Sequence, residues 1–520
     1  MSAALPGGRP RGRAVALAAT GGLLHTASFA PLDAWPLQIA GLFLLVLALD
    51  GATPWRAARL AWLFAFCWLA SGMWWLFISL HRFGGLAAPL AAAAVALLAA
   101  LLALYYAVSA ALWARLRSTS AAFNAALFAA CWLLAELARG IVFTGFPWIA
   151  GGYAHTDGPL AAWAPWIGVY GIGALAAWLA AAAALAWQGR GRPVRAALLL
   201  ALPTALCAAG TALPAEFTRS TGTLGVTLLQ SNIEQDLKFD PAHIDRVLRW
   251  HQAALTAARG TLVLTPESSI PLPLNLLDAE TLAALRAPFA QGERAALVGL
   301  FTGSDTAGYT NSVVALSATS DPSGNAFYAY GKRHLLPFGE IIPPGFGWFV
   351  RALNIPIGDQ VRGQSTLPLM VAGQRVRPLI CFEDLFGEDI AQSVVGDGAA
   401  TVLANSTNLA WFGPLMVEDQ HLQFSRMRAL EFQRPIIRAT NTGTTAVVDH
   451  LGAIAARLPP LIEGALEASV EGRIGATPYA RWLAAWGLWP AMALALLIVA
   501  VAGQPHRWLR KTLANRNHSH

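Results

Sequence analysis

Long apolar runs separated by short polar connections dominate the first 212 residues of the chain. Seven such runs occur, at residues 14–30, 36–52, 58–80, 86–114, 121–140, 160–187 and 194–212. An eighth run covers 481–503, and a tail follows at 504–520. Each run has roughly the 17–25 residues that a helix needs to cross a bilayer, or more if the helix is tilted. The pattern therefore predicts seven membrane-spanning helices within 1–212 and an eighth at 481–503.

Residues 222–475 carry an ordinary density of charge and shorter apolar patterns. Strands are expected at 224–230, 261–265, 296–300, 311–318, 325–331, 376–380, 400–405 and within 436–448, and helices at 240–258, 277–290, 385–394 and 416–432. Strand–helix alternation mixed with direct strand-to-strand connections favours an α/β sandwich, with sheets inside and helices outside. A domain of about 250 residues is long enough to bury a full core.

Composition and charge agree with a membrane protein that carries one soluble domain. Of all residues 56% are hydrophobic and only 12% are charged, whereas about a quarter of the residues in a soluble protein are charged. In an eight-span arrangement the basic residues beside the runs fall on one side: Arg9, Arg11, Arg13, Arg56, Arg59, Arg115, Arg117, Arg190, Arg192, Arg195, Arg507, Arg510 and Lys511. Basic residues favour cytoplasmic loops, so both termini are expected in the cytoplasm and the 222–475 domain outside it. The net charge of +7 therefore indicates topology and gives no support to nucleic-acid binding.

Cysteine usage singles out one residue of the soluble domain. Three of the four cysteines, Cys67, Cys131 and Cys207, lie inside apolar runs and are expected to be packing residues. Only Cys381 lies within 222–475, so no disulfide is possible inside that domain. Zinc-like Cys/His spacings and phosphate-binding glycine loops are absent from the sequence, so neither a metal nor a cofactor is expected.

The local sequence gives Cys381 a setting where a thiolate would be stabilised. The strand-like residues 376–380 run into it, and 384–391 resemble the start of a helix with acidic residues in its first turn. The N-terminus of a helix favours negative charge, which lowers the pKa of a nearby thiol. The ordinary alternative is a buried core cysteine.

Two more polar residues end predicted strands. Glu267 follows 262–266, and Lys332 follows 328–331. Sites on parallel sheets gather where strands end, so Glu267, Lys332 and Cys381 are expected in one cluster. Lysine is also scarce: the chain has three lysines against 33 arginines among its 36 basic residues. A retained lysine can supply a compact ammonium donor that arginine cannot replace.

These residue types together suit acyl transfer. A thiol needs a base to become a nucleophile, and Glu267 would take its proton. Attack on an ester or amide makes an oxyanion, which Lys332 and a backbone N–H would stabilise. Glu340 and Glu383 are candidates to hold the lysine or assist proton movement, and a solvated surface carboxylate is the alternative for each glutamate.

The Glu267–Lys332–Cys381 order resembles the triad of the nitrilase superfamily. Further stretches resemble the bacterial apolipoprotein N-acyltransferase family in particular: 144–148, 265–268, 309–312, 330–340, 410–413 and 426–431. The similarity extends from the first apolar run to the last. It implies an eight-span membrane domain joined to an α-β-β-α sandwich of the nitrilase type, in the bacterial inner membrane with the sandwich in the periplasm.

The resemblance also implies a two-step, ping-pong reaction through a cysteine acyl-enzyme. Cys381 would take the sn-1 acyl chain of a phospholipid, phosphatidylethanolamine being the expected donor, and form a thioester. The α-amine of the N-terminal diacylglyceryl-cysteine of an apolipoprotein would then attack it, which completes lipoprotein maturation. Glu340 and Glu383 match acidic positions that this family requires.

Six residues are expected to contact the substrates: Gly145, Trp148, Phe239, Asn311, Phe382 and Trp411. Gly145 and Trp148 belong to an aromatic loop that suits either an interfacial anchor or a mouth for a lipid chain. Three positions depart from the family pattern. Phe239 replaces a frequent tryptophan and Phe382 a frequent tyrosine, so both lose a hydrogen-bonding group. Leu409 replaces a frequent aspartate.

Two other functions fit some of the same features. A membrane-tethered amidase would use the same triad but release a free acid to water. A transporter or scaffold would leave Cys381, Lys332 and Glu267 without a joint purpose, and the predicted spans lack an obvious internal path of charged residues.

Overall fold

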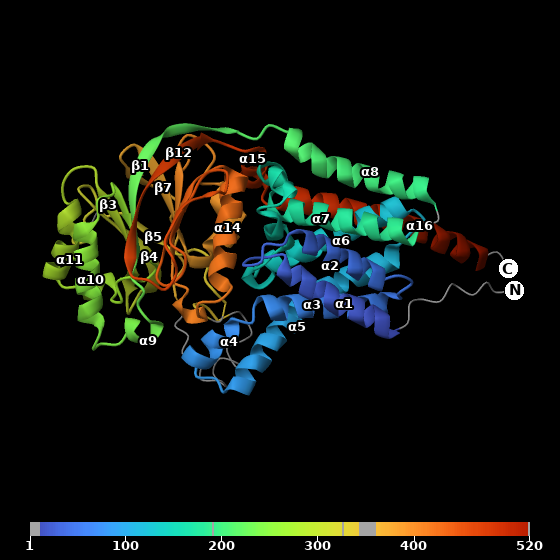
Figure 1. Ribbon diagram of the computed structural model, residues 1–520, viewed down its shortest axis with the longest axis horizontal. Coiled ribbons are helices and arrows are strands. Elements are labelled where there is room, and N and C mark those ends of the chain that lie inside the picture. The colour runs from blue at the N-terminus through green and yellow to red at the C-terminus, as the bar shows by residue number, and fades with distance from the viewer. Residues whose placement is uncertain (1–10, 190–191, 325–326, 338, 343–359, 518–520) are drawn as a thin grey trace. The chain divides into compact units, whose positions relative to one another are not determined.

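The protein divides into two compact units, each of which has its own helices or sheets. The computed structural model describes residues 11–189, 192–324, 327–337, 339–342 and 360–517 (Figure 1). The first unit takes its described residues from the stretches up to Trp74, from Ala92 to Ala215 and from Trp486 onward. The second combines Trp75–Ala91 with Glu216–Ala485.

The first unit is a group of apolar helices. They are α1 (Arg11–Ala27), α2 (Pro36–Ala48), α3 (Pro54–Gly72), most of α5 (Ala88–Leu116), α6 (Ala121–Ile141), α7 (Ala164–Gln188), α8 (Pro193–Ala209) and α16 (Trp489–Asn517). Polar caps fix where some of them begin. Thr53 accepts a hydrogen bond from the Arg56 N–H at the start of α3, and Ser120 accepts one from the Phe123 N–H at the start of α6. Short 3-10 turns, η2 (Val142–Thr144), η3 (Gly151–His155), η4 (Pro159–Trp163) and η5 (Gly210–Ala212), join or flank these helices.

The helices agree only in part with the predicted spans. Three are long and apolar enough to cross a bilayer, Ala88–Leu116, Ala121–Thr144 and Pro159–Gln188, and α2 and α8 are apolar but shorter. The spans predicted at 58–80 and 481–503 each correspond to a bent pair of helices, and a count of eight spans stays a prediction. The chain bends by 64° between Pro54–Gly72 and Leu76–Phe83, and by 84° between Pro478–Trp486 and Trp489–Gln504. Met73 has non-helical backbone angles and Gly487 has a φ of +57°, so neither continues a helix.

The second unit contains two six-stranded sheets. In the first the strand order is β12-β1-β2-β3-β4-β5, made from β1 (Thr218–Gln230), β2 (Leu262–Leu264), β3 (Ala295–Ser304), β4 (Gly308–Ser317), β5 (Ala329–Gly331) and β12 (Gly464–Gly475). In the second it is β11-β10-β9-β8-β7-β6, made from β6 (Leu369–Val371), β7 (Gln374–Ile380), β8 (Val402–Thr407), β9 (Ile436–Thr440), β10 (Ala446–Val448) and β11 (Ile454–Arg457). Each sheet has three neighbouring parallel strands, β1-β2-β3 and β7-β8-β9, between antiparallel ones.

The sheets and helices form the predicted α-β-β-α sandwich. Buried apolar residues of both sheets, such as Val226, Leu264, Ile380 and Ile437, make one core cluster between them. A second cluster packs α10 (Ile244–Ala257) and α11 (Ala279–Arg286) on the outer face of the first sheet. Helix α14 (Val417–Phe432) covers the other sheet (Figure 1). The sequence therefore predicted the layers correctly.

Shorter elements complete the second unit and account for the remaining differences from prediction. They are the helices α4 (Leu76–Ile78), η1 (Ser79–Phe83, a π turn), α9 (Gln235–Lys238), α13 (Gly387–Ala391) and α15 (Pro478–Trp486), and the 3-10 turns η6 (Leu274–Leu276), η7 (Ala287–Phe289), η8 (Cys381–Leu385) and η9 (Ala410–Phe412). The helix expected at 385–394 is only the five residues of α13. Strands β6, β11 and β12 were not predicted, and residues 325–326 of the strand expected at 325–331 lie outside the described residues.

Candidate active site

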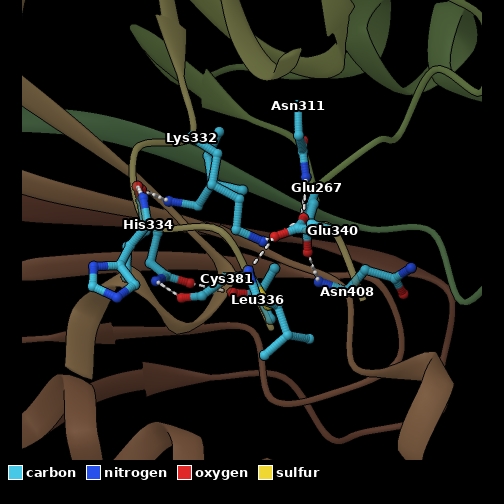
Figure 2. A network of polar contacts seen from close by, with 12 residues as sticks. Glu267, Asn311, Lys332, His334, Leu336, Glu340, Cys381 and Asn408 are labelled. Atoms are coloured by element: carbon cyan, nitrogen blue, oxygen red, sulfur yellow. Dashed lines mark hydrogen bonds and ion pairs between the residues drawn. The ribbon is translucent and has the colours of Figure 1, made fainter. Parts of the chain in front are cut away.

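The three predicted triad residues lie at strand ends in one corner of the sandwich. Glu267 comes three residues after β2, while Lys332 and Cys381 directly follow β5 and β7. The ends of the two sheets are joined there, because the Ser406 hydroxyl of β8 donates to the Thr265 carbonyl at 2.9 Å. Figure 2 shows Glu267, Lys332 and Cys381 grouped with Glu340. Strand-end placement therefore predicted the cluster.

An ammonium between two carboxylates forms the polar centre of the cluster. Lys332 Nζ lies 3.2 Å from Glu267 Oε1 and 2.8 Å from Glu340 Oε1 (Figure 2). Although burial alone would lower the pKa of Lys332, the charges of Glu267 and Glu340 raise it well above its usual value. Lys332 therefore stays protonated and acts as a fixed donor. Glu340 therefore contacts the lysine ammonium, and its part in the reaction stays a prediction.

Backbone and amide donors fix the Glu267 carboxylate. Asn311 Nδ2 donates to Glu267 Oε1 at 2.7 Å, and the Asn408 N–H donates to Glu267 Oε2 at 3.0 Å. Lys238 Nζ donates to the Glu267 backbone carbonyl at 2.8 Å. Asn311, predicted to contact a substrate, thus contacts the carboxylates in this structure. A carboxylate oriented on both oxygens is well placed to act as a base.

The Cys381 thiol is a weak acid in this setting. Burial and the Glu267 charge raise the pKa of Cys381 well above its usual value, although the Lys332 charge and the Phe382 N–H act in the opposite direction. The expected stabilisation of a thiolate by a helix N-terminus is therefore wrong. Cys381 begins a 3-10 turn, and the helix that follows is too short and too late to lower the pKa. The thiol needs a base before it can attack.

Glu383 accepts hydrogen bonds from backbone N–H groups. Among the described contacts it does not pair with the Lys332 ammonium. Its Oε1 accepts from the N–H groups of Arg333 and His334 at 2.7 and 3.1 Å. Its Oε2 accepts from the Ile380 N–H at 2.7 Å and from the Tyr330 hydroxyl at 2.8 Å. Because these donors flank Lys332 and Cys381, Glu383 ties the two strand ends together.

Three predicted substrate contacts lie around the site with different exposures. Phe382 is buried, with its ring centroid 5.4 Å from Lys332 Nζ. Phe239 and Trp411 are exposed, at 44% and 38%. Their two segments are joined because Asn408 Nδ2 donates to Gln235 Oε1 at 2.7 Å. Phe239 and Trp411 therefore remain available to a ligand, while Phe382 packs beneath the lysine.

The segment Trp75–Ala91, which includes the end of one predicted span and the start of the next, belongs to this same unit. Trp75 stacks edge-on against Phe412 with ring centroids 4.8 Å apart, and Phe83 does so against Trp411 at 5.5 Å. Arg82 Nη2 lies 2.8 Å from Asp236 Oδ2. Sequence reasoning placed residues 75–80 in a span. It missed the aromatic contacts that this segment makes with Trp411 and Phe412 of the catalytic domain.

Gly145 and Trp148 lie in the first unit. Gly145 has a φ of +82°, and a Cβ there would lie 1.9 Å from the Gly140 carbonyl oxygen, so the turn requires glycine. Trp148 is buried, and its carbonyl accepts from Arg139 Nη1 at 2.7 Å. Arg139 also pairs with Glu136 at 3.4 Å inside the unit. Gly145 and Trp148 thus have structural roles, and their contact with a substrate stays a prediction.

Comparison with known proteins decides the family. A family model described as the apolipoprotein N-acyltransferase N-terminal domain matches residues 21–182, and one described as carbon-nitrogen hydrolase matches 226–479. A curated apolipoprotein N-acyltransferase of Verminephrobacter eiseniae is 47% identical over 481 residues, which cover 87% of this chain and 89% of the relative. The chain belongs to the apolipoprotein N-acyltransferase family.

A second curated relative agrees. The apolipoprotein N-acyltransferase of Ralstonia nicotianae is 44% identical over 498 residues, covering 94% of this chain and 93% of the relative. Among solved structures, a CN-hydrolase superfamily protein of Xanthomonas campestris aligns with a TM-score of 0.35 at 20% identity, over 52% of this chain and 97% of that one.

Two residues that hold the acyltransferase triad were missed by sequence reasoning. Asn408 follows β8 just as Glu267 follows β2, so its strand-end position was a usable signal. Lys238 is one of the three lysines, yet only Lys332 was singled out among them. Among the described residues, no group of three or more histidine, cysteine, aspartate or glutamate side chains is arranged to hold a metal ion.

Replacement of Lys238 should raise the stability of the protein and lower its activity. Lys238 is 1% exposed, and burial lowers its pKa from 10.5 to about 8 despite the opposing charge of Glu267. Because the pKa of Lys238 is lower in the folded than in the unfolded protein, protonated Lys238 lowers the free energy of unfolding. The loss is about 3 kcal/mol below pH 8, and it fades as the pH rises toward 10.5. Lys238→Met removes this penalty and one hydrogen bond, so we expect about 1 kcal/mol of net stabilisation at pH 7.

The same substitution removes the donor from the Glu267 backbone, so acyl transfer should fall about tenfold. Thermal unfolding of the detergent-solubilised protein at pH 7 and pH 10, with turnover measured at pH 7, tests both effects. The stabilisation should be smaller at pH 10. Lower stability at pH 7 together with unchanged turnover would contradict this account of Lys238.

Proposed function

We propose that this protein is an apolipoprotein N-acyltransferase that works through an acyl thioester on Cys381. The observation that carries the proposal is the Lys332 ammonium held by Glu267 and Glu340 beside Cys381, in a chain related to this family over almost its whole length. Glu267 is the base, Cys381 the nucleophile and Lys332 the oxyanion donor.

The first half-reaction takes an acyl chain from a phospholipid. Glu267 accepts the thiol proton as Cys381 Sγ attacks the sn-1 ester carbonyl of phosphatidylethanolamine. The oxyanion of the tetrahedral intermediate receives hydrogen bonds from Lys332 Nζ and the Phe382 N–H. The carbon–oxygen bond then breaks, the leaving alkoxide takes the proton from Glu267, and a lysophospholipid departs from the thioester.

The second half-reaction delivers the chain to the lipoprotein. The neutral α-amine of an N-terminal diacylglyceryl-cysteine attacks the thioester carbonyl, and Glu267 takes a proton from the attacking nitrogen. The carbon–sulfur bond breaks, and the leaving Cys381 thiolate takes the proton from Glu267. The product is an N-acylated, triacylated lipoprotein, so the same base serves both halves.

We also propose the membrane layout that these substrates need. Residues 1–212 would form seven spans and 481–503 the eighth, with 504–520 in the cytoplasm. The catalytic domain at 222–475 would then lie in the periplasm, where both lipid substrates are at hand. The support is the apolar sequence pattern with its one-sided basic residues. In this layout the spans at 58–80 and 481–503 would bend near Met73 and Gly487, where the helices change direction.

The test separates the two half-reactions. Purified protein is incubated with phosphatidylethanolamine labelled in its sn-1 chain, without acceptor, and the Cys381 peptide is weighed by mass spectrometry. We expect one acyl adduct on Cys381 that is stable for minutes, and none in Cys381→Ala. Addition of a diacylglyceryl-cysteine peptide should then remove the adduct and place the label on the peptide amine.

Hydrolysis is the competing outcome. A membrane-tethered amidase would release labelled free fatty acid to water and leave the peptide amine unmodified. Free fatty acid as the main product, or no adduct under any condition, would refute the transferase proposal. A donor labelled in its sn-2 chain serves as the matched control, because it should leave Cys381 unlabelled.

A further inference from the structure

Glu418 is a buried carboxylate that the chemistry above does not use. It is the second residue of α14 and is 4% exposed, and its Oε1 atom has no hydrogen-bond partner within the described part of the chain. An ionised carboxylate is costly to bury without a partner. A buried polar group left unpaired in a folded protein usually marks a functional role, a bound water or a bound ion.

The charged side chains that act on Glu418 are Asp419 and Arg457, and these two pair with each other. Arg457 Nη2 lies 3.3 Å from Asp419 Oδ1 and donates to the Thr444 hydroxyl at 3.2 Å. Burial and the Asp419 charge raise the pKa of Glu418 from 4.5 to about 7, although the Arg457 charge lowers it. Because Arg457 is held by Asp419 and Thr444, the ionised form of Glu418 keeps a capacity for a further cation.

Glu418 lies beside the segment that holds the catalytic base. A Cβ placed on Gly443 would be 3.2 Å from Leu409 Cδ1 and 3.4 Å from Glu418 Cγ, so these three residues meet at one point. Leu409 directly follows Asn408, whose N–H donates to Glu267 Oε2 at 3.0 Å. The Leu409 side chain and one peptide unit therefore separate Glu418 from Glu267.

Apolar side chains near this segment are exposed in a way that suits a lipid. Trp411 and Leu415, in the chain that leads into α14, are 38% and 52% exposed. Phe239, in the segment that Gln235 joins to Asn408, is 44% exposed. A phospholipid whose apolar part contacts these side chains can place its head group at the start of α14.

A primary ammonium is the cation that fits this position. It carries one positive charge and N–H donors, which complement a single carboxylate. The ammonium of phosphatidylethanolamine lies at the end of the head group, many bonds from the sn-1 ester. This separation suits a carboxylate that lies beyond Leu409. The α-amine of the acceptor, by contrast, must come into contact with the thioester on Cys381 in order to attack it.

We propose that Glu418 binds the ammonium of the donor's ethanolamine head group, and so makes phosphatidylethanolamine a better donor than phosphatidylglycerol, which has no ammonium. The inference rests on the proposed acyl transfer and names the residue that selects the head group. The contact forms when the lipid binds and persists while the sn-1 chain is transferred. It should therefore lower the half-saturating concentration of the lipid and leave the rate at saturation unchanged.

The test compares two donors that carry the same labelled sn-1 chain and differ in head group. Thioester formation on Cys381 is measured with phosphatidylethanolamine and with phosphatidylglycerol, in the unmodified protein and in Glu418→Gln. We expect the half-saturating concentration of phosphatidylethanolamine to rise about tenfold in Glu418→Gln, the effect of losing one charge-assisted hydrogen bond. The values for phosphatidylglycerol and both rates at saturation should stay the same.

Glu280→Gln is the matched control, because Glu280 is an exposed carboxylate that is likewise the second residue of its helix. It should keep the preference for phosphatidylethanolamine. Thermal unfolding of Glu418→Gln at pH 8 should occur at no lower temperature than in the unmodified protein, since the substitution removes a buried charge that lacks a partner. Equal changes for both lipids in Glu418→Gln would indicate a structural role and overturn the proposal.

A second measurement needs no variant and decides the matter if Glu418→Gln fails to fold. The ionised carboxylate binds the ammonium, so the preference of the unmodified protein for phosphatidylethanolamine should grow as the pH rises from 5 to 8, through the pKa of Glu418 near 7. The ratio of the two donors cancels the titration of Cys381, which serves both. A ratio that stays constant over this range would contradict the proposal.

Failure of this inference differs from failure of the proposed function. If the unmodified protein forms no Cys381 adduct from either lipid, the acyl transfer itself is refuted. If adducts form with no preference between the lipids, only the role of Glu418 is refuted. If Glu418→Gln slows only the delivery of the chain to the peptide amine, the ammonium at Glu418 belongs to the acceptor, and the head-group proposal is wrong.

Discussion

Glu267→Gln should lower acyl transfer on the order of 10³-fold, since general base catalysis is worth 10²–10⁴. The glutamine keeps the size and shape of the side chain, but its single amide oxygen can accept either from the Asn408 N–H or from Lys332 and not from both. What is lost is the carboxylate that, in the proposed mechanism, takes the Cys381 proton in the first step and the amine proton in the second. Single-turnover measurements should therefore show both half-reactions slowed.

The same substitution should make the thiol easier to ionise. The negative charge of Glu267 is one of the causes that raise the pKa of Cys381, whereas Lys332 lowers it. Removing the charge therefore lowers the pKa, and at pH 8 a larger fraction of Cys381 is thiolate. Iodoacetamide should then alkylate Cys381 faster in the variant while acyl transfer collapses.

These two opposite changes distinguish a base from a structural carboxylate. Misfolding would slow transfer without shifting the alkylation profile to lower pH. Glu280→Gln, an exposed carboxylate in the first turn of α11, is the matched control and should change neither rate. An acyl transfer rate within tenfold of normal in Glu267→Gln would exclude Glu267 as the base.

The sequence could predict that the triad residues lie together because the features that mark them are visible in short stretches of sequence. Strand-end positions bring Glu267, Lys332 and Cys381 to one edge, and the scarcity of lysine marked Lys332. Which of Glu340 and Glu383 contacts the Lys332 ammonium could not be predicted in this way. Both are acidic residues close to the triad in sequence, yet Glu340 meets the ammonium while Glu383 is saturated by backbone and tyrosine donors. That difference depends on the path of the backbone.

Other features lay beyond the sequence because they depend on contacts between distant segments. The bend after Gly72 is invisible to a hydropathy pattern, since the residues on both sides are apolar. Contacts such as the packing of Trp75 on Phe412 and of Phe83 on Trp411 show that this stretch belongs with the sandwich. The raised pKa of Cys381 likewise arises from burial and from Glu267, more than 100 residues away in the chain.

Lys332→Arg should lower acyl transfer by about 10²–10³-fold, the usual cost of losing one oxyanion donor. Charge is kept, but the ammonium occupies a narrow place. It is 2% exposed, lies 2.8 Å from Glu340 Oε1, and has the Phe382 ring centroid at 5.4 Å. A planar guanidinium is larger and prefers to bind a carboxylate with two parallel hydrogen bonds. It would therefore pair with one glutamate and point no donor at the oxyanion.

Alkylation of Cys381 shows whether the charge or the donor geometry is responsible. A positive charge at position 332 lowers the pKa of Cys381. Iodoacetamide should therefore alkylate Cys381 at an almost normal rate in Lys332→Arg, and more slowly at the same pH in Lys332→Met. Arg246→Lys, an exposed exchange on α10, is the matched control and should leave acyl transfer unchanged. Near-normal turnover in Lys332→Arg would mean that positive charge alone suffices. The proposed role of Lys332 as the oxyanion donor would then be wrong.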